Sequence, residues 1–366
     1  MSIGLLARQL KVRRPAELGQ RLEALIAETP DNPLLASLNL SLERLDDEAR
    51  QWLPRLGVFQ GGAMESNLVA ISGYSEAQWQ KLRPALEATG LIQLEHLAGM
   101  GVPYLNFHPT LAPALWSPLS SEEQAELITR HRLRYYLVSG YLYREDKQHA
   151  YQVSAIAQRE LPNLMYAVHG ALDAGEAWGV EFVNNVNKFL EDFGLNRDRA
   201  VLNQLAKPVG GEVGSRSWYV VQSNLGNQLY SLGRYQEAVQ VFTEVLFGLG
   251  EQPSYERCII LGQLGLSFYA QGQAAKAEKY YRQGLTLAQQ LEPSDTVKRQ
   301  KGVLQINLAD VLRDVGNYGE ARIAYETALT IFREQNDDRA IGAVEGQLGT
   351  LAMLQGNYHR GSPTQL

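Results

Sequence analysis

The sequence predicts a mainly all-α protein, with one small β-hairpin in its first third and a solenoid of stacked helical hairpins in its C-terminal half. Three observations lead to this fold class. A pattern recurs four times after residue 217, short helices precede two short strands before residue 118, and the composition is globular, with 45% hydrophobic and 20% charged residues. A length of 366 residues favours two or three domains.

The recurring pattern begins with an amide residue, a leucine and a small residue, and runs on to a turn glycine. In the first copy these are Asn224-Leu225-Gly226 and Gly233. Successive turn glycines are 39, 44 and 40 residues apart, at Gly233, Gly272, Gly316 and Gly356. A period in this range is typical of a solenoid built from one repeated supersecondary unit. We expect a second helix after each turn, with a small residue near its start at Ala238, Ala277 and Ala321.

This pattern resembles the tetratricopeptide repeat over residues 218–358, in about three and a half copies. The usual unit has ~34 residues, and the longer spacing here is similar to that of repeats in kinesin light chains and bacterial signalling ATPases. The resemblance implies an α-solenoid whose inner lining recognises another polypeptide. The fourth copy lacks its second helix, because Gly361-Ser362-Pro363 stands where alanine is expected. We therefore expect either a longer natural chain or a shortened reading frame.

Residues 31–118 predict a different unit, in which helices precede a two-stranded hairpin. Asp46 is suited to cap one helix and Ser75 another, with Gln78 as the capping-box partner of Ser75. Two short apolar runs predict strands joined by a tip at Ala98–Gly101. The expected elements lie at residues 34–45, 46–57, 64–72, 76–89, 91–95 and 103–107. Their order predicts a winged-helix-like domain.

The residues of this unit resemble the winged-helix domain of STAND ATPases, the signal-transduction NTPases with numerous domains that are related to NB-ARC proteins. The resemblance rests on Ser41–Ala49, Leu53–Phe59, Gly90–Ile92 and Tyr104–Pro109. It extends to residues 1–30 as the end of a preceding helical domain, and to residues 119–208, with Glu160–Leu164, as a helical connector into the repeats at 209–366. It implies the sensor half of a signalling protein, with a protein or peptide trigger and a nucleotide-binding domain in cis or in trans.

The same resemblance implies a nucleotide-sensing role for His108. Members of the family place a histidine at the end of the returning strand, in a Met-His-Asp-like motif, where it contacts the β-phosphate of bound ADP. Here the motif reads Phe107-His108-Pro109, so proline replaces the acid and the role of that acid is absent. A histidine packed at a strand-to-helix corner is the alternative, and both interpretations stay open.

Motifs for catalysis or for a cofactor are not found in the sequence. A phosphate loop needs a Gly-Lys pair, which occurs nowhere, and the six histidines have no metal-ligand spacing. The single cysteine, Cys258, excludes a disulfide framework and is expected to be a buried thiol, which fits a reducing cytoplasm. No apolar run reaches the ~18 residues of a membrane span. We expect no enzyme activity, cofactor, metal or membrane partner.

Charge argues against nucleic acid as a partner. The net charge is −6, and the predicted recognition helix at residues 76–89 carries only Lys81 and Arg83 as bases. The basic, aromatic segment at residues 130–136 is interpreted as a helix with one charged and one packed face, rather than as a phosphate site.

An amide recurs at one position of every copy, at Asn224, Gln263, Asn307 and Gln347. Amides both donate and accept hydrogen bonds, so a ladder of them is suited to grip the backbone of an extended peptide. Alternatively, they bond to neighbouring backbone and stiffen the stack. Other candidates for the same peptide-binding groove are Asn227, Tyr230, Tyr269, Asp310, Arg313 and Met353. No carboxylate clamp is expected, because the positions that would carry its Lys or Arg are Ser223, Gly262, Ile306 and Gly346.

Three functions remain open from the sequence. The first is a non-catalytic sensor and protein-interaction module of a STAND-type signal-transduction protein. The second is a stand-alone tetratricopeptide adaptor or scaffold, in which the winged-helix unit has no signalling role. The third is a transcriptional regulator that places its winged helix on DNA.

Overall fold

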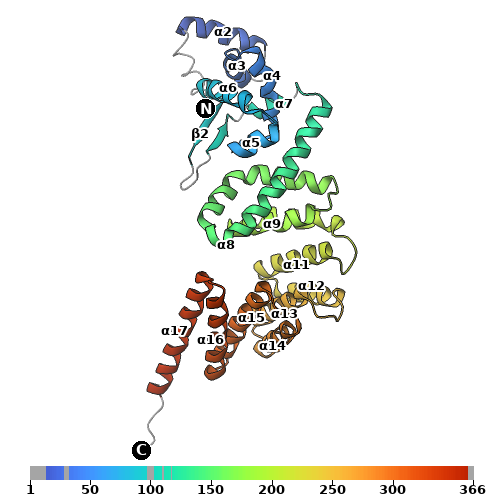
Figure 1. The fold of residues 1–366 in the computed structure, drawn as a ribbon, viewed down its shortest axis with the longest axis vertical. Helices are drawn as coiled ribbons and strands as arrows, with labels where there is room; N and C mark the ends of the chain where they lie inside the picture. The colour runs from blue at the N-terminus through green and yellow to red at the C-terminus, as the bar shows by residue number, and fades with distance from the viewer. Residues whose placement is uncertain (1–13, 29–32, 97–102, 109–110, 117, 362–366) are drawn as a thin grey trace, which may run out of the picture. The chain divides into compact units, whose positions relative to one another are not determined.

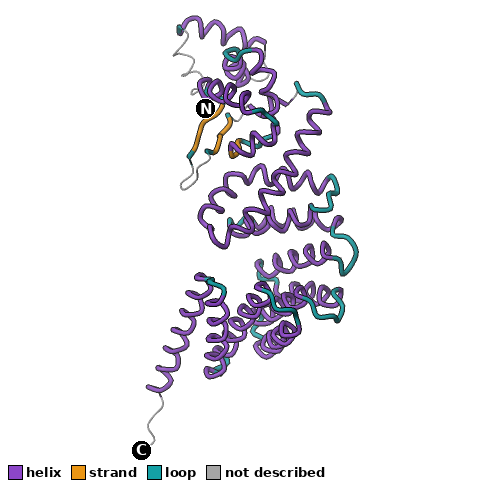
Figure 2. Tube along the Cα trace, in the orientation of Figure 1, coloured by secondary structure: helices purple, strands orange, loops and turns teal. Residues whose placement is uncertain are grey.

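The computed structural model describes residues 14–28, 33–96, 103–108, 111–116 and 118–361, and it confirms the mainly helical fold class (Figure 1, Figure 2). The predicted tip at Ala98–Gly101, the Ser362-Pro363 break and residues 1–13 lie outside these described residues. The chain forms two compact units, Met1–Leu195 and Asn196–Leu366. Among the described helices, none combines the length and the apolar character needed to cross a membrane.

The first unit begins with short helices and three short strands. Both predicted caps are confirmed: Asp46 Oδ1 accepts the Ala49 N–H at 2.8 Å, and Ser75 and Gln78 form a capping box. The elements are α2 (Pro15–Glu28), α3 (Pro33–Leu42), α4 (Asp47–Trp52), η1 (Leu53–Val58), β1 (Gly62–Met64), α5 (Glu65–Ser72), α6 (Glu76–Thr89), β2 (Ile92–Glu95), β3 (Tyr104–Phe107) and α7 (Leu111–Trp116).

The sheet has three antiparallel strands in the order β1-β3-β2, where the sequence predicts only two. β3 is central, and it pairs Asn106 with Gly62 on one side and with Gln93 on the other. Gly62 is required at this point, since a Cβ there would lie 2.4 Å from the carbonyl oxygen of Leu105. The three residues of β1 are too few to show an alternating pattern, so the sequence does not predict this strand.

α8 (Ser121–Asp173) is a helical hairpin with two antiparallel arms. The backbone leaves the helical region at His149, where φ is −130° and ψ is 41°. The arms are in contact, because Tyr135 on the first bonds to Glu160 on the second at 2.7 Å, and Arg132 bonds to the carbonyl of Gly170 at 2.8 Å. α9 (Gly179–Asp192) packs against this hairpin and completes the unit.

The second unit is a run of paired helices, which begins with α10 (Asn196–Ala206) and η2 (Lys207–Val209). The pairs are α11 (Arg216–Ser231) with α12 (Tyr235–Gly248), α13 (Tyr255–Ala270) with α14 (Ala274–Gln290), and α15 (Asp295–Asp314) with α16 (Tyr318–Glu334); α17 (Asp338–Gly361) follows. Gly233, Gly272 and Gly316 make the predicted turns at φ 74°, 74° and 84°. The turn predicted at Gly356 is wrong, because α17 continues as a helix through this residue to Gly361.

An aromatic ring from each second helix explains the small residue in the repeat pattern. The Phe242 ring lies on Gly226 and the Tyr281 ring on Gly265, so a Cβ at either glycine would be 2.4 Å from a ring carbon. Tyr325 and Ala309 are the corresponding buried residues of the third copy. The alanines that the sequence places near the start of the second helices, Ala238, Ala277 and Ala321, are fully buried. Stacking of rings on small residues therefore sets the distance between paired helices.

Candidate functional site

The first helices of the repeats carry the ten predicted groove residues at aligned positions. We call this set the first-helix face: Asn224, Asn227 and Tyr230 on α11, Gln263 and Tyr269 on α13, Asn307, Asp310 and Arg313 on α15, and Gln347 and Met353 on α17. Met353 is 74% exposed, and the other nine are half-buried. Hydrogen bonds from α13 to α15 and from α15 to α17 make the face continuous over these three helices.

Of the four aligned amides, one forms a hydrogen bond with a neighbouring described helix and three do not. Gln347 Oε1 accepts a hydrogen bond from Arg313 at 2.6 Å, so this amide stiffens the stack. The side-chain amides of Asn224, Gln263 and Asn307 make no hydrogen bond with any described residue, and Asn224 Nδ2 is buried. Gln347 therefore follows the structural interpretation, whereas the ligand-binding interpretation of Asn224, Gln263 and Asn307 stays a prediction.

Arg313 is the centre of a hydrogen-bond network that links four helices. One of its terminal nitrogens donates to Asp310 at 3.2 Å and to the Tyr325 hydroxyl at 3.2 Å, besides Gln347. Its other nitrogens hold Asp314 at 2.9 Å, and the second oxygen of Asp314 accepts the Tyr269 hydroxyl. Tyr269, Asp310 and Arg313 are thus brought together in one network, and their role in a peptide-binding groove stays a prediction. Asp314 and Tyr325 complete the network and are not among the predicted residues.

Burial and charge act against each other in this network. Burial raises the pKa of Asp310, although Tyr325 and Arg313 both favour its ionised form. Burial opposes the charge of Arg313, but its hydrogen bond to Asp314 and its acidic neighbours outweigh this effect and raise its pKa. Burial, followed by the bond to Asp314, raises the pKa of Tyr269 to about 12. Two carboxylates face one guanidinium here, so this end of the face has an excess of negative charge.

The second repeat lacks the acceptor that the third repeat supplies to its tyrosine. Tyr325 donates to Asp310, and Leu266 occupies the position that corresponds to Asp310. As a result the hydroxyl of Tyr281, whose side chain is fully buried, has no hydrogen-bond partner among the described residues. The aligned sequences show leucine in place of aspartate, but only the structure shows that the hydroxyl of Tyr281 is left without an acceptor in the described part of the chain.

His108, the predicted nucleotide-sensing residue, lies directly after β3. Its backbone N–H donates to the carbonyl of Leu91 at 2.9 Å, and its carbonyl accepts the Leu111 N–H at 2.9 Å. The side chain is half-buried at this strand-to-helix corner. Its role toward a nucleotide stays a prediction.

The two bases of α6 are paired with acids of the first unit. On α6, Lys81 contacts Asp46 at 3.0 Å and Glu48 at 2.5 Å, and Arg83 contacts Glu65 at 2.6 Å and Glu87 at 2.8 Å. In the segment 130–136, Arg132 and Arg134 bond to Gly170 and Asn67. His131 and Tyr135 are fully buried. This confirms the interpretation of residues 130–136 as a helix with a packed face.

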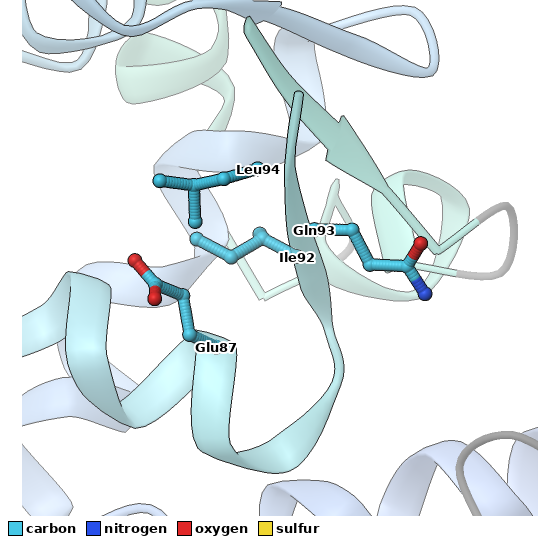
Figure 3. Close-up of a pocket in the computed structure, with 4 residues that line it drawn as sticks. All are labelled: Glu87, Ile92, Gln93 and Leu94. Carbon is cyan, nitrogen blue, oxygen red and sulfur yellow. The ribbon is translucent and has the colours of Figure 1, made fainter. Parts of the chain in front are cut away.

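A shallow hollow of about 490 Å³ lies between α6 and β2 (Figure 3). Ile92 and Leu94 point toward Glu87, whereas Gln93 points to the other side of the strand. Glu87 pairs with Arg83 at 2.8 Å, and Ile92 is buried. It has no convergent polar groups among the described residues, and we assign it no ligand.

Cys258 is a buried core thiol, as the sequence predicts. Its Sγ contacts the carbonyl oxygen of Gly284 at 3.4 Å, and burial raises its pKa to about 11. A thiol with this pKa is a poor nucleophile at neutral pH. Within the described residues, His, Cys, Asp and Glu side chains do not gather in a group that could hold a metal ion.

Two sequence models of the tetratricopeptide repeat match the second unit, over residues 219–290 and residues 304–335. The chain therefore contains tetratricopeptide repeats. No curated protein matches it.

Solved structures with a similar fold have low sequence identity. One is a Signal Transduction ATPase with Numerous Domains with a tetratricopeptide repeat sensor, from Pyrococcus horikoshii, at 12% identity and a TM-score of 0.41, covering 94% of this chain and 61% of that one. Another is a protein of nearly identical TPR-like repeats from Podosopora anserina, named after kinesin light chain, at 17% identity and a TM-score of 0.41. The match covers 56% of this chain and 97% of that one. A third is PilF of Pseudomonas aeruginosa, at 19% identity and a TM-score of 0.36, covering 61% and 93%. The chain thus spans about three fifths of the length of the first protein.

Proposed function

We propose that the chain is a non-catalytic interaction and sensor module of a STAND-type signal-transduction protein, and that its first-helix face binds a protein or peptide. The proposal has two parts. Tetratricopeptide repeats support the binding of a polypeptide. The sensor role rests on the sequence resemblance of residues 31–118 and 119–208 to the winged helix and connector of that family.

One observation carries the binding part. Three aligned amides, on Asn224, Gln263 and Asn307, are not engaged by any described residue. Gln263 and Asn307, which are half-buried, each carry a donor and an acceptor on the same face. An extended peptide presents alternating N–H and C=O groups, and the amides can pair with these groups regardless of its side chains.

Affinity capture with variants of the full chain tests this part. The N224A/N307A variant removes two rungs of the ladder, and we expect it to lose polypeptides that the wild type captures from native lysate. The matched control is Q240A/Q283A, which removes two exposed amides from the second helices α12 and α14. Mass spectrometry identifies the captured chains, and circular dichroism confirms equal folding. Equal capture by both double variants would show that the ladder is only structural.

The transcriptional alternative is disfavoured by the contacts of α6. Lys81 and Arg83 are its two bases, and both are neutralised by acids of the same unit. DNA recognition helices need such cations for phosphates and base edges. We expect no salt-dependent shift of duplex DNA by the full chain, and no ATP hydrolysis by the pure protein.

A further inference from the structure

A strand edge in the first unit is covered by side chains in place of a neighbouring strand. β1 pairs with β3 through one edge only, where Gly61 accepts the Phe107 N–H at 2.9 Å and Glu65 donates to Pro103 at 3.1 Å. Its other edge carries the outward backbone groups of residues 60, 62 and 64. An uncovered edge of this kind invites pairing with another chain, so proteins cover it.

Glu160 and Asn163 of α8 bond to these outward groups at three alternate residues. Asn163 Oδ1 accepts the Gln60 N–H at 2.7 Å, and Asn163 Nδ2 donates to the Gly62 carbonyl at 2.7 Å. Glu160 Oε1 accepts the Met64 N–H at 2.8 Å. Being three residues apart, Glu160 and Asn163 share one helix face. We call this arrangement the Glu160–Asn163 clasp; it occupies the place of a fourth strand.

The clasp also ties α5 and the first arm of α8 into the same cluster. Glu160 Oε1 accepts a second bond from Asn67 Nδ2 at 3.1 Å. Glu160 Oε2 accepts bonds from the Tyr135 hydroxyl at 2.7 Å and from Asn163 Nδ2 at 3.1 Å. All four hydrogen bonds to the carboxylate therefore come from uncharged donors. Glu160, Asn163 and Tyr135 are fully buried.

These bonds depend on one another. If the carboxylate of Glu160 is withdrawn, the Met64 N–H, the Asn67 amide and the Tyr135 hydroxyl all lose an acceptor in a buried place. Each such loss is costly, so partial opening is disfavoured. Opening of the whole clasp, in contrast, breaks no strand pairing and lets water reach every group at once. We therefore expect the clasp to open as a whole and not bond by bond.

We propose that the Glu160–Asn163 clasp is a conformational joint that locks β1 and α5 to the α8 hairpin and releases them as one unit when it opens. In a sensor module, this joint would pass a displacement of residues 31–118 to the α8 hairpin. This signalling role rests on the proposed function. The opening itself does not depend on any partner.

Hydrogen exchange of the full chain, read by mass spectrometry with residue-level fragmentation, tests the joint. In N163A we expect the amides of Gln60 and Met64 to exchange at least tenfold faster, with α5 following and the helices of the second unit unchanged. E160Q retains an acceptor oxygen, and should keep more of the Met64 protection than E160A. The matched control is N185A, since Asn185 is another buried asparagine, on α9, that bonds to Ser139 at 3.3 Å.

Two results would contradict the proposal that the clasp is a conformational joint. One is unchanged protection of the Gln60 and Met64 amides in N163A. The other is faster exchange spread evenly over the first unit, which marks an ordinary core contact. If N163A does not fold, E160Q serves instead: it keeps one acceptor oxygen and loses the other, so exchange should still rise at Met64 and α5 and not over the rest of the first unit if the joint is real. Loss of partner capture leaves this measurement unaffected, and the two proposals can fail separately.

Discussion

Tyr325 donates its hydroxyl to Asp310 Oδ1 at 2.5 Å, between the second and first helices of the third repeat. The equivalent hydroxyl of Tyr281 in the second repeat has no such acceptor, because Leu266 stands in the place of Asp310. The hydroxyl of the same residue type at equivalent positions is therefore bonded in one repeat and unsatisfied in its neighbour.

Removal of the two hydroxyls should change stability in opposite directions. Y281F deletes an unsatisfied buried hydroxyl and should raise the unfolding free energy by about 1 kcal/mol. Y325F deletes a bond to a carboxylate and should lower it by roughly 1–2 kcal/mol. Urea unfolding of the full chain, followed by circular dichroism, measures both. Equal effects of the two substitutions would contradict this account of the Tyr281 hydroxyl.

Arg313 should hold α17 to the preceding repeat. R313M keeps the length of the side chain but removes its bonds to Gln347, Asp310 and Asp314. We expect a loss of roughly 2 kcal/mol, with faster hydrogen exchange confined to α15–α17. The control is R322M, which removes an exposed contact from α16 to Gln355 on α17 and should cost less than about 0.5 kcal/mol. Similar exchange in the two variants would show that the network does not anchor α17.

The second helix of each repeat should tolerate no enlargement at its buried alanine. A277L places a larger side chain at a fully buried site and should cost ~1–3 kcal/mol through overpacking. A275L makes the same change at an exposed position of the same helix and should be close to neutral. Thermal unfolding followed by circular dichroism compares the two, and an unchanged midpoint for A277L would count against this helix pairing.

His131 should make the first unit sensitive to acid. Burial lowers its pKa from 6.5 to about 4, although a hydrogen bond with Asn163 opposes the shift. The unfolded chain therefore takes up this proton at a higher pH than the folded one. Stability from this group is complete above pH 6.5 and is lost as the pH falls toward 4, by about 3 kcal/mol in total.

The variant H131Q isolates this effect, because glutamine can donate to Asn163 but does not titrate in this range. Its thermal midpoint should fall less than that of the wild type between pH 6.5 and 4. Burial raises the pKa of the neighbouring Glu160, which acts in the opposite direction but is present in both proteins. Parallel pH profiles for the two proteins would rule out His131 as the titrating group.

The repeats could be predicted from the sequence because their determinants are local. Gly233, Gly272 and Gly316 each fix a turn by their own conformation, and the small residues face a ring in the next helix of the same copy. Gly356 has the same sequence context but no described second helix packs after it, and the helix continues. A turn glycine thus permits a reversal, and packing of the returning helix is what stabilises it.

The Glu160–Asn163 clasp and strand β1 could not be predicted from the sequence because their partners are distant in the chain. Gly62 belongs to a strand only because β3 pairs with it, and the bonds from Gln60 and Met64 reach residues about 100 positions away. Glu160 and Asn163 belong to the segment that resembles the connector of STAND ATPases, but no local sequence pattern indicates that they cover a strand edge. The reversal at His149 likewise has neither glycine nor proline to signal it.

The stacking of Phe242, Tyr281 and Tyr325 on small residues has a consequence for how such a chain changes over generations. Each ring meets its small partner inside its own hairpin, so this fit does not depend on the full length of either helix. The intervals of 39 and 44 residues differ because the helices differ in length: α12 and α13 have 14 and 16 residues, whereas α14 and α15 have 17 and 20. Selection can therefore lengthen a helix at the end away from the ring, whereas a larger residue at the small position requires a smaller ring opposite it.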